Sequence, residues 1–305
     1  MRTPPYGRLF FAISAAALLA GCGSGATLPT ALRTSAAADA MQPTAKAQDL
    51  LYISDLGAND VAVYTYPKGS LISKLTGFGS VAGLCSNKAG DVFVVNEAGP
   101  VVAYAHGGDT PIRKLTTSGA PFGCSVDPVT GNLALTQGSA YEYGAIAVYP
   151  KAKGTPKIYE DEQIDATWFC GYDGTGNLFA DAWDRYGNVE LVELPKGAKA
   201  FKKFKLGKTF NKAGAVQWDG KYIAVGNYGD GVIYRTTESG HVAATVTLKG
   251  GANVEQFWIA GSTLIGPAAQ STGTAPFWHY PAGGSAYKTI TGLTWPFGAT
   301  LSLAH

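Results

Sequence analysis

One short segment recurs six times along this chain, and the repeat limits the possible folds more than any other feature. The copies occupy residues 83–87, 123–127, 169–173, 215–219, 256–260 and 298–302. Their last residues follow one another at intervals of 40 to 46 residues. A period of this length is typical of repeat architectures, in which each copy belongs to one small unit of structure.

Each of the first five copies is followed by three further strand-like runs. Tight turns rich in Gly and Asn lead to a second apolar run (91–95, 132–136, 177–181, 221–225, 262–266), then to an alternating third run (100–104, 144–149, 188–194, 231–235, 275–280), and then to a polar fourth run (113–116, 156–159, 201–205, 242–248, 287–291). With 40 glycines, 16 prolines and only 15% charged residues, the composition argues against a helical bundle or coiled coil. The pattern predicts four-stranded antiparallel blades of a β-propeller.

The two ends of the chain complement each other. Residues 50–76 hold three strand-like runs without a preceding copy of the repeat, and the sixth copy has nothing after it but the C-terminus. Three N-terminal strands and one C-terminal strand would together make a complete blade and leave no open edge. We therefore expect an all-β fold, a six-bladed β-propeller over residues 49–305, as a single domain.

The N-terminus has the features of an export signal. Two arginines, Arg2 and Arg8, flank the start of an apolar stretch over residues 9–20, which is too short to span a bilayer as a helix. The stretch ends in Leu-Ala-Gly before Cys22 and resembles the lipobox of bacterial lipoproteins. This resemblance implies cleavage of a signal peptide over residues 1–21 and acylation of Cys22, whereas the alternative is an ordinary signal peptide with an incidental cysteine.

The predicted anchor has consequences for location and partners. Residues 22–48 are rich in Ala, Thr, Ser and Pro and are expected to form a flexible lipidated linker. The resemblance implies secretion by the general export route and a lipid anchor in the bacterial cell envelope, at the outer membrane or cell surface. The lipid bilayer would then be a partner through Cys22. Without residues 1–21 the chain has 22 basic and 22 acidic residues, so we expect no nucleic-acid partner.

The repeat itself resembles that of NHL-type and YncE-like propellers. Residues 120–127 (APFGCSVD), the turn to Gly131-Asn132-Leu133 and residues 295–298 (WPFG) have the Pro-x-Gly entry, the apolar strand ending in Asp, and the Gly-Asn turn of that repeat. The resemblance covers nearly all of residues 49–305. It implies the fold and leaves the function open, because propellers of this kind include scaffolds, ligand binders and unrelated enzymes.

Several residue groups could carry chemistry, and each has a structural alternative. Cys85, Cys124 and Cys170 fall in consecutive inner strands, where they are either small buried side chains or, for two of them, a disulfide between neighbouring blades. The four histidines share no repeat position, which argues against a metal or catalytic cluster. The acidic groups at 160–165 and 181–184 are interpreted as solvated loops, and the lysines at 196–212 as protection of an outer strand.

The predicted binding site lies at one mouth of the central channel. The loops before the inner strands and after the second strands should meet there, because propeller geometry places them on one face. They would bring together aromatic and polar side chains suited to a neutral ligand: Phe122, Trp168, Glu255, Trp295, Phe297, Asp55, Asn96, Asp181 and Asn227. The structural alternative is that the aromatic rings wedge between blades and the polar residues hold turns.

Two functions remain open from the sequence. The absence of a clustered histidine and carboxylate set favours an envelope-anchored lipoprotein whose propeller is a non-enzymatic platform for a glycan, a peptide or an envelope protein, with no cofactor. The alternative is a metal-dependent hydrolase or lyase of the six-bladed lactonase-like type, acting at the channel mouth. Glu255 is the only carboxylate among the six positions directly before the inner strands, with Asp55 and Asp181 nearby.

Overall fold

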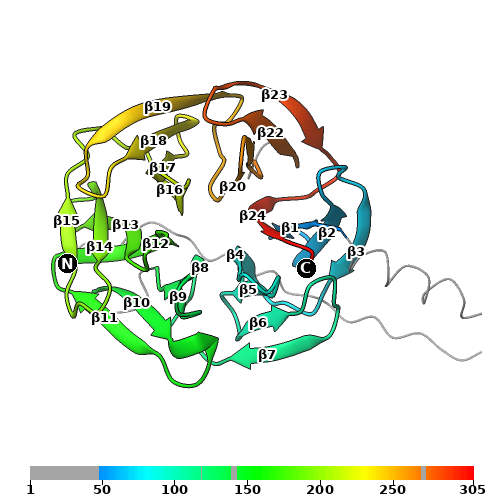
Figure 1. Ribbon diagram of the computed structural model, residues 1–305, viewed down its shortest axis with the longest axis horizontal. Helices are drawn as coiled ribbons and strands as arrows, with labels where there is room; N and C mark the ends of the chain where they lie inside the picture. Colours follow the sequence, from blue (N-terminus) through cyan, green and yellow to red (C-terminus); the bar gives the residue numbers. More distant parts are fainter. Residues whose placement is uncertain (1–47, 118, 139–142, 269–272) are drawn as a thin grey trace, which may run out of the picture.

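The computed structural model describes residues 48–117, 119–138, 143–268 and 273–305. These residues form antiparallel β-sheets arranged in a ring (Figure 1). The predicted signal peptide, Cys22 and the linker up to residue 47 lie outside the described residues. No helix within the described ranges is long and apolar enough to cross a membrane.

Four sheets have four strands each. The strand of each sheet nearest the centre of the ring, which we call its inner or first strand, is β4, β8, β12 or β24 (Figure 1). The bounds in the first two sheets are β4 (Val81–Ser86), β5 (Val92–Asn96), β6 (Val101–Tyr104), β7 (Pro111–Leu115), and β8 (Cys124–Val126), β9 (Leu133–Thr136), β10 (Gly144–Tyr149), β11 (Lys157–Asp161). A short 3-10 helix, η1 (Pro150–Ala152), joins β10 to β11. The third sheet contains β12 (Ile164–Tyr172), β13 (Leu178–Asp184), β14 (Val189–Leu194) and β15 (Lys202–Phe204).

The fourth of these sheets joins the two ends of the chain, as the sequence predicts. Its order is β24 (Pro296–Ser302), β1 (Leu50–Asp55), β2 (Asp60–Thr65) and β3 (Leu71–Leu75). The C-terminal strand pairs antiparallel with the first strand, with Leu50 opposite Ser302 and Ile53 opposite Ala299. Every residue of β24 is buried, so the ring closes without a covalent link.

The remaining eight strands form one sheet, which differs from the expectation of six separate blades. Its order is β16 (Ala213–Trp218), β17 (Ile223–Asn227), β18 (Val232–Thr236), β19 (Val242–Lys249), β23 (Gly283–Ile290), β22 (Ala275–His279), β21 (Thr263–Ile265) and β20 (Trp258–Ala260). The pairing is antiparallel except where β19 meets β23 over two residue pairs, Leu248–Gly284 and Lys249–Ser285.

A glycine explains why these two outer strands join. Gly283 has a φ of +70°, and a β-carbon at this position would lie 2.4 Å from the carbonyl oxygen of Thr247. Only a residue without a side chain allows the start of β23 to approach β19 so closely. The sequence shows the glycine pair at 283–284, but the repeat pattern contains no signal for this contact.

The core lies between adjacent sheets. Tyr52 and Val61 from one sheet pack with Leu84 and Val92 from the next in a single buried cluster. Strands between two neighbouring sheets can therefore be buried on both faces, as in β5, the second strand of its sheet. The described strands and the contacts between β24 and β1 that close the ring lie within residues 48–305.

Candidate functional site

The geometry of the ring defines two faces. We call the face where the inner strands begin the entry face; it contains Phe122 and Phe297. The opposite side, where the inner strands end, is the exit face; it contains the turns that follow Ser86 and Val126. Because each sheet is an antiparallel meander, the turns between first and second strands and between third and fourth strands lie on the exit face.

The structure brings three of the four predicted aromatic residues together. The Phe122 ring centre lies 4.8 Å from that of Trp168 and 5.2 Å from that of Phe297, both with edge-to-face geometry. Phe169 joins them at 5.3 Å from Phe122. Phe122 and Phe297 precede or begin inner strands that are separated by β4, so their contact spans the channel. These four rings form a plug at the entry face, and Trp295 lies outside it, 40% exposed.

The predicted polar residues on the entry face accept hydrogen bonds from the backbone. Asp55 accepts from the N–H groups of Thr294 and Trp295, both at 2.7 Å. Asn96 accepts from Gly79 and Ser80 at 3.2 and 3.0 Å. Each acceptor belongs to the second strand of a blade, and each donor pair precedes the inner strand of the same blade.

The same device recurs in two other sheets. Asp181 Oδ1 accepts from the N–H groups of Trp168 and Phe169, and Asn227 Oδ1 accepts from the Asn211 N–H at 3.0 Å. The register shifts at the start of the inner strands, as between Thr167 and Cys170, leave these N–H groups without a partner in the ladder. Carboxylate and amide oxygens supply the missing acceptors, which explains their periodic spacing in the sequence.

Two glutamates on the entry face have perturbed acidity. Burial raises the pKa of Glu255 to about 7, with Lys212 opposing the rise and Glu97 adding to it. Burial also raises the pKa of Glu97, whose carboxylate accepts a hydrogen bond from the Ser80 hydroxyl at 3.1 Å. The sequence patterns did not single out Glu97, although its place directly after Asn96 points to the entry face.

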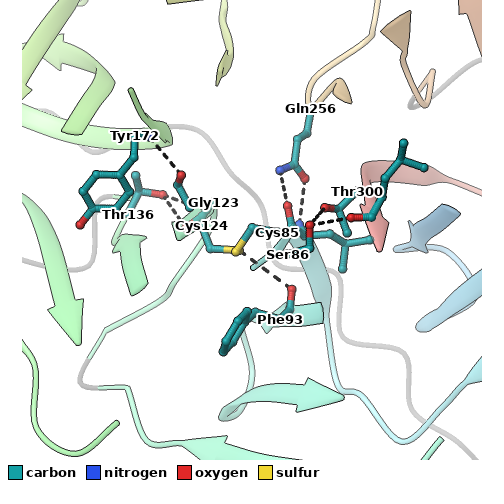
Figure 2. The surroundings of a disulfide bond; sticks show 12 residues. Cys85, Ser86, Phe93, Gly123, Cys124, Thr136, Tyr172, Gln256 and Thr300 are labelled. Atoms are coloured by element: carbon teal, nitrogen blue, oxygen red, sulfur yellow. Dashed lines mark hydrogen bonds between the residues drawn. A yellow bond between two sulfur atoms is a disulfide. The ribbon is translucent and has the colours of Figure 1, made fainter. Parts of the chain in front are cut away.

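The centre of the ring is linked by side chains (Figure 2). Cys85 in β4 and Cys124 in β8 form a disulfide, with their α-carbons 5.7 Å apart, so the disulfide alternative holds for this pair. Cys170 is free and buried, and burial raises the pKa of its thiol. The disulfide joins the inner strands of neighbouring sheets.

Gln256 crosses from the loop before β20 to β4 (Figure 2). Its amide accepts from the Leu84 N–H at 2.9 Å and donates to the Leu84 carbonyl at 2.8 Å. It passes Gly298 of β24, where a β-carbon would lie 2.1 Å from the Gln256 Oε1 atom. Together with the aromatic plug, this bridge narrows the channel toward the entry face.

Two adjoining cavities occupy the other end of the channel. The inner one, of about 260 Å³, is lined by residues of β4, β8, β12 and β16 and by the segment 256–258. The outer one, of about 790 Å³, is lined by the exit-face turns after β4 and β8, by β20, and by Tyr66, Leu301 and Leu303. Because Ser86, Val126, Pro128 and Trp258 belong to both walls, we treat the cavities as one exit-face funnel.

The funnel wall is largely uncharged. Trp218 and Tyr172 face the inner cavity, and Trp258 borders both. Of the carboxylates in the wall, Asp127 and Asp173 cap the turns that follow their strands: Asp127 accepts from the Val129 N–H at 2.8 Å, and Asp173 accepts from three successive N–H groups. Aromatic faces with a few polar groups suit a neutral ligand.

The remaining charged groups have structural roles. Lys203 pairs with Asp161 at 2.9 Å, and Asp184 caps its own turn by accepting from the Tyr186 and Asn188 N–H groups. Within the ranges that the structure describes, no three His, Cys, Asp or Glu side chains are grouped as metal ligands.

Comparison with known proteins supports the fold alone. No protein-family model matches the chain, and no curated protein matches its sequence. The crystal structure of a protein of unknown function from Bacteroides caccae is similar, with a TM-score of 0.64 and 12% identity. The match covers 84% of this chain and 99% of that chain. The shared feature is a propeller-like ring of antiparallel β-sheets.

Proposed function

We propose that this chain is a six-bladed propeller that binds a neutral ligand without chemical conversion and is held at the bacterial envelope by a lipid on Cys22. In this proposal the eight-stranded sheet counts as two blades, β16–β19 and β20–β23. Each group is an antiparallel four-stranded meander, and two parallel residue pairs are the whole ladder between them. The repeat of residues 120–127 supports an NHL-like assignment for these blades.

The exit-face funnel is the observation that carries the binding function. It is open at the end opposite the aromatic plug and is walled by aromatic and uncharged side chains. Its volume suits a short glycan or peptide segment. The indole rings of Trp218 and Trp258 line the funnel, where each could stack on a ligand and offer an N–H donor to it.

The envelope location rests on the N-terminal sequence. The apolar stretch before Cys22 and the small residues preceding it support export by the general route and acylation, at the outer membrane or cell surface. Metabolic labelling with a tagged fatty acid should modify the wild-type chain and leave Cys22→Ala unlabelled. A chain that is exported but never labelled would contradict the lipid anchor.

Ligand binding is tested by tryptophan fluorescence on residues 48–305. Titration with panels of neutral oligosaccharides and neutral peptides should reveal saturable quenching, which Trp258→Ala should weaken about tenfold or more. Trp295→Ala is the matched control, because this tryptophan is exposed outside the plug on the entry face. Loss of binding in Trp295→Ala with full binding in Trp258→Ala would place the site on the entry face, and no binding to either panel would contradict the function.

One observation favours a second candidate, a metal-dependent hydrolase or lyase of the lactonase-like type. Glu255 is buried and Glu97 is half-buried on the entry face; burial raises the pKa of both carboxyl groups, and the nearby charge of Glu97 raises the pKa of Glu255 further. Metal analysis of purified residues 48–305 separates the candidates. A stoichiometric divalent cation that is lost in Glu255→Gln would favour the enzyme.

A further inference from the structure

We propose that the exit face docks on an anionic lipid surface, as a membrane contact separate from any lipid on Cys22. Three features support this contact: the charge of the turns around the funnel, the apolar rim of the funnel, and the point where the chain enters the ring. It does not depend on which ligand occupies the funnel.

Exposed lysines border the funnel in the exit-face turns of the four four-stranded sheets and of β16–β19. The turns between third and fourth strands carry exposed Lys68, Lys151, Lys153, Lys196 and Lys199. The turns between first and second strands add exposed Lys88 and Lys221. All of these turns belong to the described residues, and they hold seven exposed lysines.

Exposed acids are scarce on the same turns. Asp109 and Glu238 are the exposed carboxylate side chains in the described residues of these turns. The other acids there are buried or half-buried: Asp219, for example, accepts hydrogen bonds from the Lys221 and Tyr222 N–H groups and pairs with Arg235. The exit face is therefore strongly basic although the predicted mature chain is neutral overall.

The turns of the two kinds lie side by side, so their lysines form one surface. The Lys151 N–H donates to Asn132 Oδ1 at 3.0 Å, and the Lys196 N–H donates to Asn177 Oδ1 at 3.0 Å. Each contact joins an outer turn to the inner turn of the same blade. A ring of cations on one face attracts an anionic bilayer, with an interaction that salt screens.

Apolar side chains stand at the centre of this basic ring. Val129 and Leu303, which line the outer cavity, are 53% and 50% exposed. Basic residues around exposed apolar side chains are the arrangement that suits a headgroup interface, in which the cations meet phosphates and the apolar groups enter the upper acyl region.

The path of the chain agrees with this orientation. The Ala304 N–H donates to Asp49 Oδ1 at 2.9 Å, and Leu50 lies opposite Ser302 at the exit-face end of β24. The described chain therefore enters the ring on the exit face, at Asp49 beside the C-terminal residues. An anchor attached ahead of Asp49 would hold the same face toward the bilayer.

The test is cosedimentation of residues 48–305 with vesicles. The protein should bind vesicles of phosphatidylcholine with phosphatidylglycerol at low salt and should not bind phosphatidylcholine alone. A variant with Lys88, Lys151, Lys196 and Lys221 changed to Gln should bind about fivefold more weakly for each lysine removed. The control variant changes Lys114, Lys205, Lys208 and Lys249 to Gln, which removes the same charge away from the exit face and should bind as the parent does.

Three results would overturn the proposal. Equal binding to neutral and anionic vesicles would remove the role of charge, and equal losses in the two variants would show that net charge alone matters. Absence of vesicle binding together with retention on an immobilised sulfated polysaccharide would assign the face to a soluble polyanion. None of these results bears on binding in the funnel, because no funnel ligand is added.

Discussion

Replacing Gly298 by Ala should break the hydrogen-bonded bridge that the Gln256 side chain makes to Leu84 across the channel. The new β-carbon would lie 2.1 Å from Gln256 Oε1, so the amide must move and lose both hydrogen bonds to Leu84. Each bond contributes about 1 kcal/mol, and the buried N–H and carbonyl of Leu84 are then left unpaired. We expect Gly298→Ala to lower the free energy of unfolding by about 3 kcal/mol.

A double-mutant cycle with Gln256→Ala isolates this cause. The single change Gln256→Ala should lower the free energy of unfolding by a similar amount, because it removes the same two hydrogen bonds. The double variant should be no less stable than Gln256→Ala within about 0.5 kcal/mol, since the added methyl group then meets no amide. Guanidinium unfolding followed by circular dichroism gives the three values, with Gly174→Ala as a control where a β-carbon meets only Trp218 Nε1 at 3.5 Å.

Two outcomes would contradict this coupling between Gly298 and Gln256. A fully additive double variant would show that Gly298 and Gln256 act independently. A Gly298→Ala protein as stable as the parent would show that Gln256 can move without losing its bonds, and the bridge would then contribute nothing measurable.

Three further predictions concern stability. Asp219→Asn should lower the free energy of unfolding by about 3 kcal/mol, because it removes the charge of a fully buried carboxylate that pairs with the half-buried Arg235 guanidinium at 2.7 Å; unchanged unfolding would contradict this pairing. Replacing Cys85 and Cys124 by Ala should lower the free energy of unfolding by about 4 kcal/mol, because the disulfide joins residues 39 positions apart and restricts the unfolded chain. An unchanged unfolding midpoint would contradict this. Burial raises the pKa of Asp181 to about 8, so its folded form keeps a proton that the unfolded chain releases near pH 4. The stability that Asp181 contributes is therefore fully present below about pH 4 and is lost as the pH rises toward 8. Asp181→Asn should flatten the resulting decline of the unfolding midpoint between pH 4 and 8, and an unchanged slope would contradict the raised pKa.

The repeat pattern allowed the strands and the ring closure to be predicted from sequence. The six copies fall in or overlap the inner strands, and β24 pairs with β1 as the incomplete ends required. The joining of β19 to β23 could not be predicted, because it depends on a close approach at Gly283 between distant parts of the chain. Strand periodicity describes each run of four strands but not the contact between the outer strands β19 and β23.

The sequence predicted which residues lie on the entry face but not the contacts that their side chains make there. Phe122, Trp168 and Phe297 meet as expected, yet they contact one another across the channel. Asp55 and Asn96 occupy the predicted face, and their oxygens accept bonds from the backbone. A repeated polar position has the same sequence signature whether it serves a ligand or a bulge, so only the hydrogen-bond geometry distinguishes the two.

Both the aromatic plug and the exit-face funnel exist only if β24 closes the ring against β1. Hydrogen exchange of residues 296–302, followed by mass spectrometry on residues 48–305, tests this closure directly. We predict that the buried amides of β24 that bond to β1 exchange as slowly as those of the interior strand β13. Exchange of the segment within seconds, at the rate of an unpaired chain end, would show an open ring and contradict the account.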